Sequence, residues 1–294
     1  MNVQAAINAG LFVQFVYNNW NVPNPNQPNS LDGKAVVTSN GNPVIPGKNY
    51  NVIKTIYAND LATDISPNKA AQGFRTIGIV AQNTADATDV FVAIRGTEGI
   101  WEWIQDARFL LRTFPPVQGS GLTEDGFTDM YVSFSLAQGG GGAFMNDVKN
   151  VLPSQANVTV TGHSLGSALA TLCALDMAVN TSCSVGLYTL ASPRVGDLTF
   201  HNLFNHVVKN AYRVANRFDV VTHVPVPPLY WHVGDDTELT PPDTMKFDLG
   251  CEHHLTTYFN MLAALINQQN QYPIDNDCLN QPVAGAVAAA HVEV

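Results

Sequence analysis

One serine stands between two glycines where a β-branched run of residues gives way to an Ala- and Leu-rich run. The stretch is VTVTGHSLGSALATL, residues 158–172, and its centre, GHSLG at 162–166, fits the pattern G-x-S-x-G. Small residues two before and two after the serine let a strand turn directly into a helix and leave the hydroxyl exposed at the strand's end. The pattern therefore predicts a nucleophile at Ser164; the alternative is a turn with a purely structural role.

A nucleophilic serine needs a histidine that accepts its proton and a carboxylate that holds this histidine in the correct tautomer. In this kind of turn the partners follow in the order serine, acid, histidine. Asp219 directly follows an apolar run that predicts a strand, so its side chain is expected at the same edge of the sheet as Ser164. Asp176 lies within the helix after the turn, Asp197 lies in a turn of its own, and the later acids lie in loops. Asp219 is therefore the candidate acid.

Two adjacent histidines, His253 and His254, are the candidates for the base. They lie in CEHHLTTYFNML, residues 251–262, where a loop is expected to run into a helix. His163 adjoins the nucleophile, but its side chain is expected on the other side of the turn. Surface or loop-bracing roles are expected for the others: His201, His206, His223 and His232. Spacing alone does not choose between the two neighbours.

The charge balance excludes some classes of partner. The chain carries 14 Lys and Arg against 24 Asp and Glu, a formal net charge of −10, which opposes binding of nucleic acid and suits a neutral substrate. No apolar run approaches the roughly 20 residues needed to span a bilayer, which excludes an integral membrane segment but leaves transient contact with a lipid surface open. The N-terminal stretch lacks the basic residues and cleavage site of a signal peptide, so a mature secreted chain and a cytosolic one both remain open.

The four cysteines, Cys173, Cys183, Cys251 and Cys278, have no spacing typical of a zinc site. Cys251 with Cys278 is the first pairing we expect if a disulfide forms. The alternative is four reduced thiols, with Cys173 packed inside its helix.

Strands alternate with helices over the second half of the chain. Before that, strands are expected over 51–60, 75–83 and 89–97, and helices over 98–111 and from 126 to 136. This order favours an α/β fold with a mostly parallel central sheet and helices on both faces. We expect a single domain over residues 1–294, with an N-terminal helix and Asn/Pro-rich wrap in 1–50 and a small-residue tail in 282–294.

Eight motifs in order resemble the class 3, fungal-type triacylglycerol lipases of the α/β-hydrolase superfamily. They cover about residues 50–260 and read VAIRGT, WEWIQDARF, GF at 126–127, VTVTGHSLGSALATL, TLASPRVGD, VANRFDVVTHVP, YWHVG and HHLTTYF. Many members of this family have a histidine before the GF pair, where this chain has Asp125. The resemblance implies an α/β-hydrolase with a short helical lid.

The resemblance also implies roles for single residues. Ser164 would be the nucleophile and Asp219 the orienting acid, and an H-x-L-x-x-Y motif favours His253 as the base, although a shorter spacing in some members fits His254. The oxyanion hole would be formed by Thr97 and Leu165.

The lid implied by the family lies at about residues 98–106. Its apolar side would contain Ile100, Trp101, Trp103 and Ile104, and two tryptophans suit a boundary between lipid and water. The alternative is a helix packed permanently on the core.

We therefore expect a serine carboxylester hydrolase, a lipase that cleaves lipid-like esters such as triacylglycerols through an acyl-enzyme, with no metal or organic cofactor. The alternatives are a feruloyl-type esterase or a phospholipase A1 on the same triad and, from a different class, a non-catalytic binding member of the fold. The family resemblance favours a secreted protein.

Overall fold

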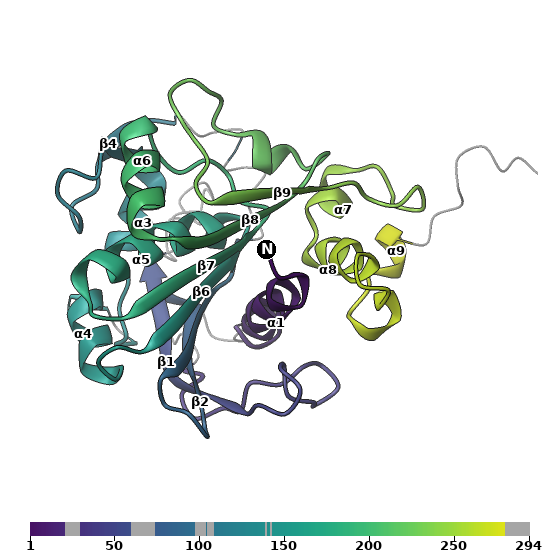
Figure 1. The fold of residues 1–294 in the computed structure, drawn as a ribbon, viewed down its shortest axis with the longest axis horizontal. Coiled ribbons are helices and arrows are strands. Elements are labelled where there is room, and N and C mark those ends of the chain that lie inside the picture. Colours follow the sequence, from purple (N-terminus) through teal and green to yellow (C-terminus); the bar gives the residue numbers. More distant parts are fainter. Residues whose placement is uncertain are drawn as a thin grey trace, which may run out of the picture.

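The computed structural model describes residues 1–20, 30–59, 74–97, 104, 109–138, 140–141 and 143–279. Within these residues the main sheet has seven strands in the order β1-β2-β3-β6-β7-β8-β9 (Figure 1). They are β1 (Tyr50–Asn59), β2 (Phe74–Asn83), β3 (Asp89–Ile94), β6 (Asn157–His163), β7 (Ser184–Leu190), β8 (Asn210–Asn216) and β9 (Asp235–Leu239). The strands from β3 to β9 are parallel, and the β1-β2 and β2-β3 pairs are antiparallel.

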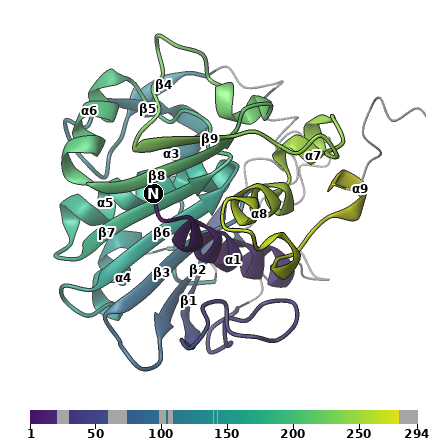
Figure 2. The ribbon, with the colours of Figure 1, turned by 45° about the vertical axis from the view of Figure 1, so that its right-hand side comes forward.

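Helices cover both faces of this sheet (Figures 1 and 2). One face carries α1 (Val3–Asn19) and α8 (Leu255–Ala264), and the other carries α3 (Asp125–Val132), α4 (Phe144–Val151), α5 (Leu165–Asn180) and α6 (Leu198–Val207). The smaller elements are β4 (Leu111–Thr113), β5 (Leu122–Glu124), η3 (Val220–His223), α7 (Leu249–His253), η4 (Gln269–Gln271) and α9 (Asn276–Leu279). No helix in the described parts of the chain is long and apolar enough to cross a lipid bilayer.

Each face of the sheet has its own hydrophobic core because the side chains of a strand alternate between the two faces. In β3, Val90, Val92 and Ile94 belong to the cluster beneath α5, whereas Phe91 and Ala93 belong to the cluster beneath α1. A strand buried on both faces reads as a continuous apolar run, which is why DVFVAI does not alternate.

The predicted mostly parallel sheet with helices on both faces is confirmed. Two helix predictions are wrong at their C-terminal ends. Leu111, expected in a helix, begins β4, which pairs with β5. The helix expected to reach residue 136 ends at Val132, because the backbone of Ser135 pairs with Tyr57 of β1. Residues 282–294, the expected tail, lie outside the described residues, as do 21–29 of the expected wrap.

A buried carboxyl group caps the N-terminus of α3. Glu124 is 4% exposed, and its Oε2 accepts a hydrogen bond of 2.8 Å from the backbone N–H of Phe127. Burial raises the pKa of Glu124 from 4.5 to about 7, against the opposing effect of its backbone hydrogen bonds. Between these two values the folded state holds the proton while the unfolded state releases it, so this group costs stability as pH rises.

We expect Glu124→Gln to remove that loss of stability. Because each pKa unit corresponds to about 1.4 kcal/mol, the free energy of unfolding of the variant relative to wild type should rise by on the order of 3 kcal/mol from pH 4.5 to 7.5. Urea unfolding of both proteins at several pH values measures this difference. Parallel pH profiles for the two proteins would contradict the prediction.

Candidate active site

The turn between β6 and α5 holds Ser164 in a strained conformation. Its φ is 61° and its ψ −133°, a region that residues with a side chain rarely adopt. A Cβ on Gly162 would lie 2.2 Å from the carbonyl oxygen of Gly166, and one on Gly166 would lie 2.3 Å from that of Ile94. Only glycine fits at these two positions, which explains the G-x-S-x-G pattern. The Ser164 hydroxyl is buried and forms no hydrogen bond with any described residue.

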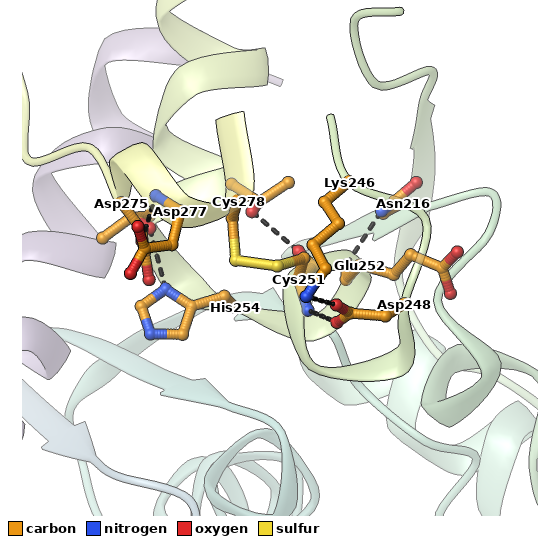
Figure 3. Close-up of a disulfide and its surroundings, with 11 residues drawn as sticks. Asn216, Lys246, Asp248, Cys251, Glu252, His254, Asp275, Asp277 and Cys278 are labelled. Atoms are coloured by element: carbon orange, nitrogen blue, oxygen red, sulfur yellow. Dashed lines mark hydrogen bonds and ion pairs between the residues drawn. A yellow bond between two sulfur atoms is a disulfide. The ribbon is translucent and has the colours of Figure 1, made fainter. Parts of the chain in front are cut away.

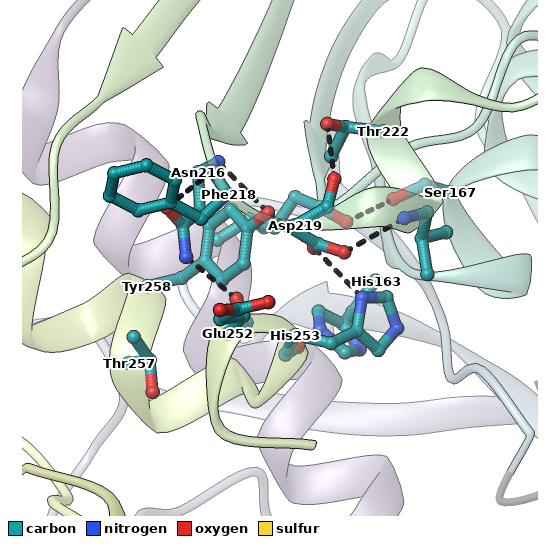
Figure 4. A network of polar contacts seen from close by, with 12 residues as sticks. His163, Ser167, Asn216, Phe218, Asp219, Thr222, Glu252, His253, Thr257 and Tyr258 are labelled. Carbon is teal, nitrogen blue, oxygen red and sulfur yellow. Dashed lines mark hydrogen bonds and ion pairs between the residues drawn. The ribbon is translucent and has the colours of Figure 1, made fainter. Parts of the chain in front are cut away.

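Asp219 lies in the loop after β8 and is the N-cap of η3, and its carboxylate is completely buried. Oδ2 accepts two hydrogen bonds, 2.8 Å from Nδ1 of His253 and 2.7 Å from the hydroxyl of Tyr258 (Figure 4). Oδ1 accepts a third, 3.0 Å from the backbone N–H of Val221. Three donors therefore replace the water that this carboxylate loses on burial.

The structure brings one of the two candidate histidines to this acid. His253, at the end of α7, is paired with Asp219, whereas Nδ1 of His254 lies 2.7 Å from Oγ1 of Thr256. The ring centroid of His163 lies 4.9 Å from the ring centroid of His253. Nε2 of the same ring lies 2.8 Å from the backbone carbonyl oxygen of His253, so the His163 side chain extends toward α7.

Tyr258 of α8 is a part of the site to which the sequence analysis gave no separate role. Its hydroxyl donates to Asp219 and accepts a hydrogen bond of 3.0 Å from the backbone N–H of Asn216. Burial raises the pKa of Tyr258 well above its usual value, so the hydroxyl stays protonated and remains a donor. Its position in the H-x-L-x-x-Y motif is the sequence feature from which this role could have been predicted.

Helix α7 is fixed to its surroundings from several sides. Asn216 Nδ2 donates to the carbonyl oxygen of Glu252 at 2.8 Å, and Thr257 Oγ1 donates to that of Cys251 at 2.7 Å. The predicted disulfide between Cys251 and Cys278 is confirmed, with a Cα–Cα distance of 5.1 Å (Figure 3). These bonds hold the backbone on either side of His253, and so they hold the ring against Asp219.

The residues expected to form the oxyanion hole lie at the ends of two neighbouring strands. Thr97 follows β3, and Leu165 is the first residue of α5 after β6. Between β3 and Thr97, the guanidinium of Arg95 donates to the carbonyl oxygens of Thr76 and Gly96 at 2.9 and 2.6 Å. The loop that carries Thr97 is therefore anchored to the sheet.

The expected lid falls mostly outside the described residues, which exclude Ile100, Trp101 and Trp103. Ile104 is partly buried and packs against the cluster beneath α5. This contact fits both a lid and a helix packed permanently on the core. Two other histidines brace loops as expected, because Nε2 of His232 lies 2.9 Å from the carbonyl oxygen of Thr222 and Nε2 of His223 lies 3.2 Å from that of Arg217.

Comparison with known proteins places this chain in a family. Residues 91–228 match the family described as Lipase (class 3). The chain is 33% identical over 212 residues to a lipase of Rhizomucor miehei, a match that covers 69% of this chain and 56% of that protein. The chain belongs to the class 3 lipase family. The chain is also 30% identical over 273 residues to a phospholipase A1, EG1, of Oryza sativa subsp. indica. This match covers 76% of this chain and 60% of that protein.

Solved structures share the fold. A mutant form of MDLA from Penicillium cyclopium has a TM-score of 0.55 and 23% identity, covering 82% of this chain and 78% of that one. A lipase from Rhizopus microsporus var. chinensis has a TM-score of 0.50 and 22% identity, covering 80% and 72%. This family member therefore has the α/β-hydrolase fold, and it spans less than two thirds of the length of the two curated relatives above.

Removal of the disulfide should lower stability. The loop that it closes spans 27 residues, so a Cys251→Ala/Cys278→Ala variant should lose about 3 to 4 kcal/mol of the free energy of unfolding. Urea unfolding with and without a reducing agent tests this. The wild type should shift toward the variant when reduced, and the variant should not change. Equal stability of the oxidised and reduced wild type would contradict the prediction.

Proposed function

We propose that this chain is a serine carboxylester hydrolase, a lipase that cleaves neutral, lipid-like esters such as triacylglycerols. The observation that carries the proposal is the pair formed by His253 and the buried Asp219, placed with a strained, buried Ser164 at the end of the central strands. Membership of the class 3 lipase family supports it. The net charge of −10 also suits a neutral substrate better than an anionic one.

In the proposed mechanism, Ser164 Oγ attacks the ester carbonyl while His253 takes its proton. The hydrogen bond between these two groups forms in the reacting complex, since catalytic hydrogen bonds are often long before substrate binds. The backbone N–H groups of Thr97 and Leu165 stabilise the oxyanion, a contribution of about 3 to 4 kcal/mol per donor. His253 then protonates the leaving alcohol, and water repeats the sequence on the acyl-enzyme.

Asp219 keeps the N–H of His253 on Nδ1, so in the proposed mechanism the other ring nitrogen accepts the proton of the serine. Tyr258 supports this role. Its hydroxyl donates to the same carboxylate oxygen, and it fixes that oxygen from the side of α8. We propose that Tyr258 is a positioning residue for the acid.

The second candidate is a phospholipase A1 that uses the same residues. It is favoured by the similarity to the phospholipase A1 EG1 of Oryza sativa, and a phospholipase A1-Igamma1 of Arabidopsis thaliana is also 29% identical over 231 residues. The two functions differ in the substrate group beyond the ester, not in the triad. A feruloyl-type esterase remains the third possibility on the same machinery.

Hydrolysis of p-nitrophenyl esters from acetate to palmitate, with Ser164→Ala as control, is the first test. We expect rates that peak at medium or long acyl chains, rise once the substrate forms an emulsion, and vanish in the variant. Emulsified triacylglycerol compared with phosphatidylcholine vesicles separates the lipase from the phospholipase. Equal background in both proteins would leave only a binding role.

The neighbouring histidines form a matched pair of variants. His253→Ala should lower kcat/KM by a factor of about 10⁴ or more, because it removes the base, whereas His254→Ala should stay within about threefold of wild type. Circular dichroism checks that both variants fold. Retained activity in the first variant together with its loss in the second would show that the assignment of the base is wrong.

A further inference from the structure

Tyr17, in the last turn of α1, reaches the candidate active site from outside the region 91–228 that matches the family. Its hydroxyl oxygen accepts a hydrogen bond of 2.8 Å from the backbone N–H of Gly96. The same hydroxyl lies 3.0 Å from Nδ1 of His163. One side chain of the N-terminal helix therefore joins the residue before Thr97 to the residue before the candidate nucleophile.

The direction of these hydrogen bonds follows from the far side of the His163 ring. Nε2 of His163 lies 2.8 Å from the backbone carbonyl oxygen of His253, and a carbonyl oxygen only accepts, so Nε2 carries the hydrogen. Burial lowers the pKa of His163 well below its usual value, so the ring is neutral and its Nδ1 is an acceptor. The hydroxyl of Tyr17 therefore donates to Nδ1.

These bonds form one continuous chain. It runs from the N–H of Gly96 through the hydroxyl of Tyr17 and the ring of His163 to the carbonyl of His253. Three backbone segments that carry groups of the proposed mechanism are linked by this chain of hydrogen bonds. They are the loop with the oxyanion donor Thr97, the turn with Ser164 and the segment with His253.

Hydrogen bonds fix both the N–H and the carbonyl group of Gly96. Its N–H donates a hydrogen bond to the hydroxyl of Tyr17, and its carbonyl oxygen accepts a hydrogen bond of 2.6 Å from Nη1 of Arg95. That carbonyl lies in the same planar peptide unit as the N–H of Thr97, so fixing one fixes the direction of the other. A Cβ on Gly96 would lie 2.7 Å from the Tyr17 hydroxyl oxygen and 2.8 Å from the Cβ of Ser164, which shows how closely these groups approach.

The last turn of α1 also supports the guanidinium that holds this peptide. The side chain of Arg95 stacks over the ring of Trp20, with 3.9 Å between the guanidinium carbon and the ring centroid. Both contacts with Gly96, one direct and one through Arg95, thus depend on the end of α1.

We propose that Tyr17 and His163 are positioning residues for catalysis. Through one hydrogen-bond chain they fix the positions of the oxyanion donor, the nucleophile and the base relative to one another. The inference rests on the proposed ester hydrolysis. Misplacement of catalytic groups by about 1 Å costs on the order of 100-fold in rate, so loss of a link in this chain should lower kcat rather than weaken ground-state binding.

The first experiment compares Tyr17→Phe with Tyr272→Phe. Tyr272 also accepts a hydrogen bond from α1, 3.0 Å from Gln4 Nε2, but it has no bond to the active-site chain. With p-nitrophenyl butyrate we expect Tyr17→Phe to lower kcat by about 10- to 100-fold with KM within about twofold, and Tyr272→Phe to change neither. Equal effects of the two variants, or a Tyr17→Phe effect on KM alone, would overturn the proposal.

A second set of variants tests whether the chain acts as a unit. Residues in one hydrogen-bond network have non-additive effects, so Tyr17→Phe/His163→Phe should be no slower than the slower single variant by more than about threefold. His163→Gln, whose amide N–H can reach toward the carbonyl of His253, should retain more activity than His163→Phe. Multiplicative losses in the double variant would contradict a single chain.

An NMR measurement tests the chain without activity. In protein with ¹⁵N-labelled histidine we expect His163 to be neutral, with its proton on Nε2, at neutral pH and to stay neutral at the pH where an ordinary histidine titrates, and Tyr17→Phe to shift its Nδ1 resonance. A proton on Nδ1 would overturn the proposal even if the variants were too unstable to assay. Failure of the proposed function looks different, because wild type would then hydrolyse no ester faster than Ser164→Ala while the His163 resonances still report the chain.

Discussion

The carboxylate of Asp219 is a negative charge buried inside the protein, and the arrangement of the site follows from the need to compensate it. A buried charge is unfavourable unless hydrogen-bond donors replace its water. Here the donors come from three elements, η3, α7 and α8, through Val221, His253 and Tyr258. The same bonds that compensate the charge bring α7 and α8 to the end of β8. Removal of one donor would leave the charge only partly compensated, so the three elements are coupled.

The two hydrophobic cores support different groups of the candidate site. The cluster beneath α5 supports the turn that carries Ser164, and the cluster beneath α1 and α8 supports the side from which Tyr17 and Tyr258 approach. The sheet between them is parallel from β3 to β9, so the ends of β3, β6 and β8 deliver their loops to one edge. Groups from the two faces therefore meet at this edge.

The features that could be predicted from the sequence have local causes. The turn around Ser164 depends on glycines two residues away, and Asp219 lies three residues after the last residue of β8, so both could be located from short stretches. The choice between His253 and His254 could not be made in this way, because it depends on the direction that α7 takes toward Asp219. Tyr17 and His163 are 146 residues apart, and nothing near either residue indicates their contact.

The helix predicted through Leu111 was wrong for a similar reason. Apolar spacing is a local signal, whereas the pairing of β4 with β5 is decided by a segment further along the chain. The disulfide pairing was predicted correctly, since Cys251 and Cys278 are the two cysteines beyond the central helices and strands.

The disulfide also sets the covalent connectivity of the site. Its ends, Cys251 and Cys278, enclose His253, Tyr258 and the whole of α8 in one closed ring of chain. A single break of the backbone between these cysteines would leave the two pieces joined through sulfur. The base would stay tethered to the body of the protein, and the C-terminal side of the break could not diffuse away. In an environment where proteases cut surface loops, this ring preserves the integrity of the segment that the proposed chemistry most depends on.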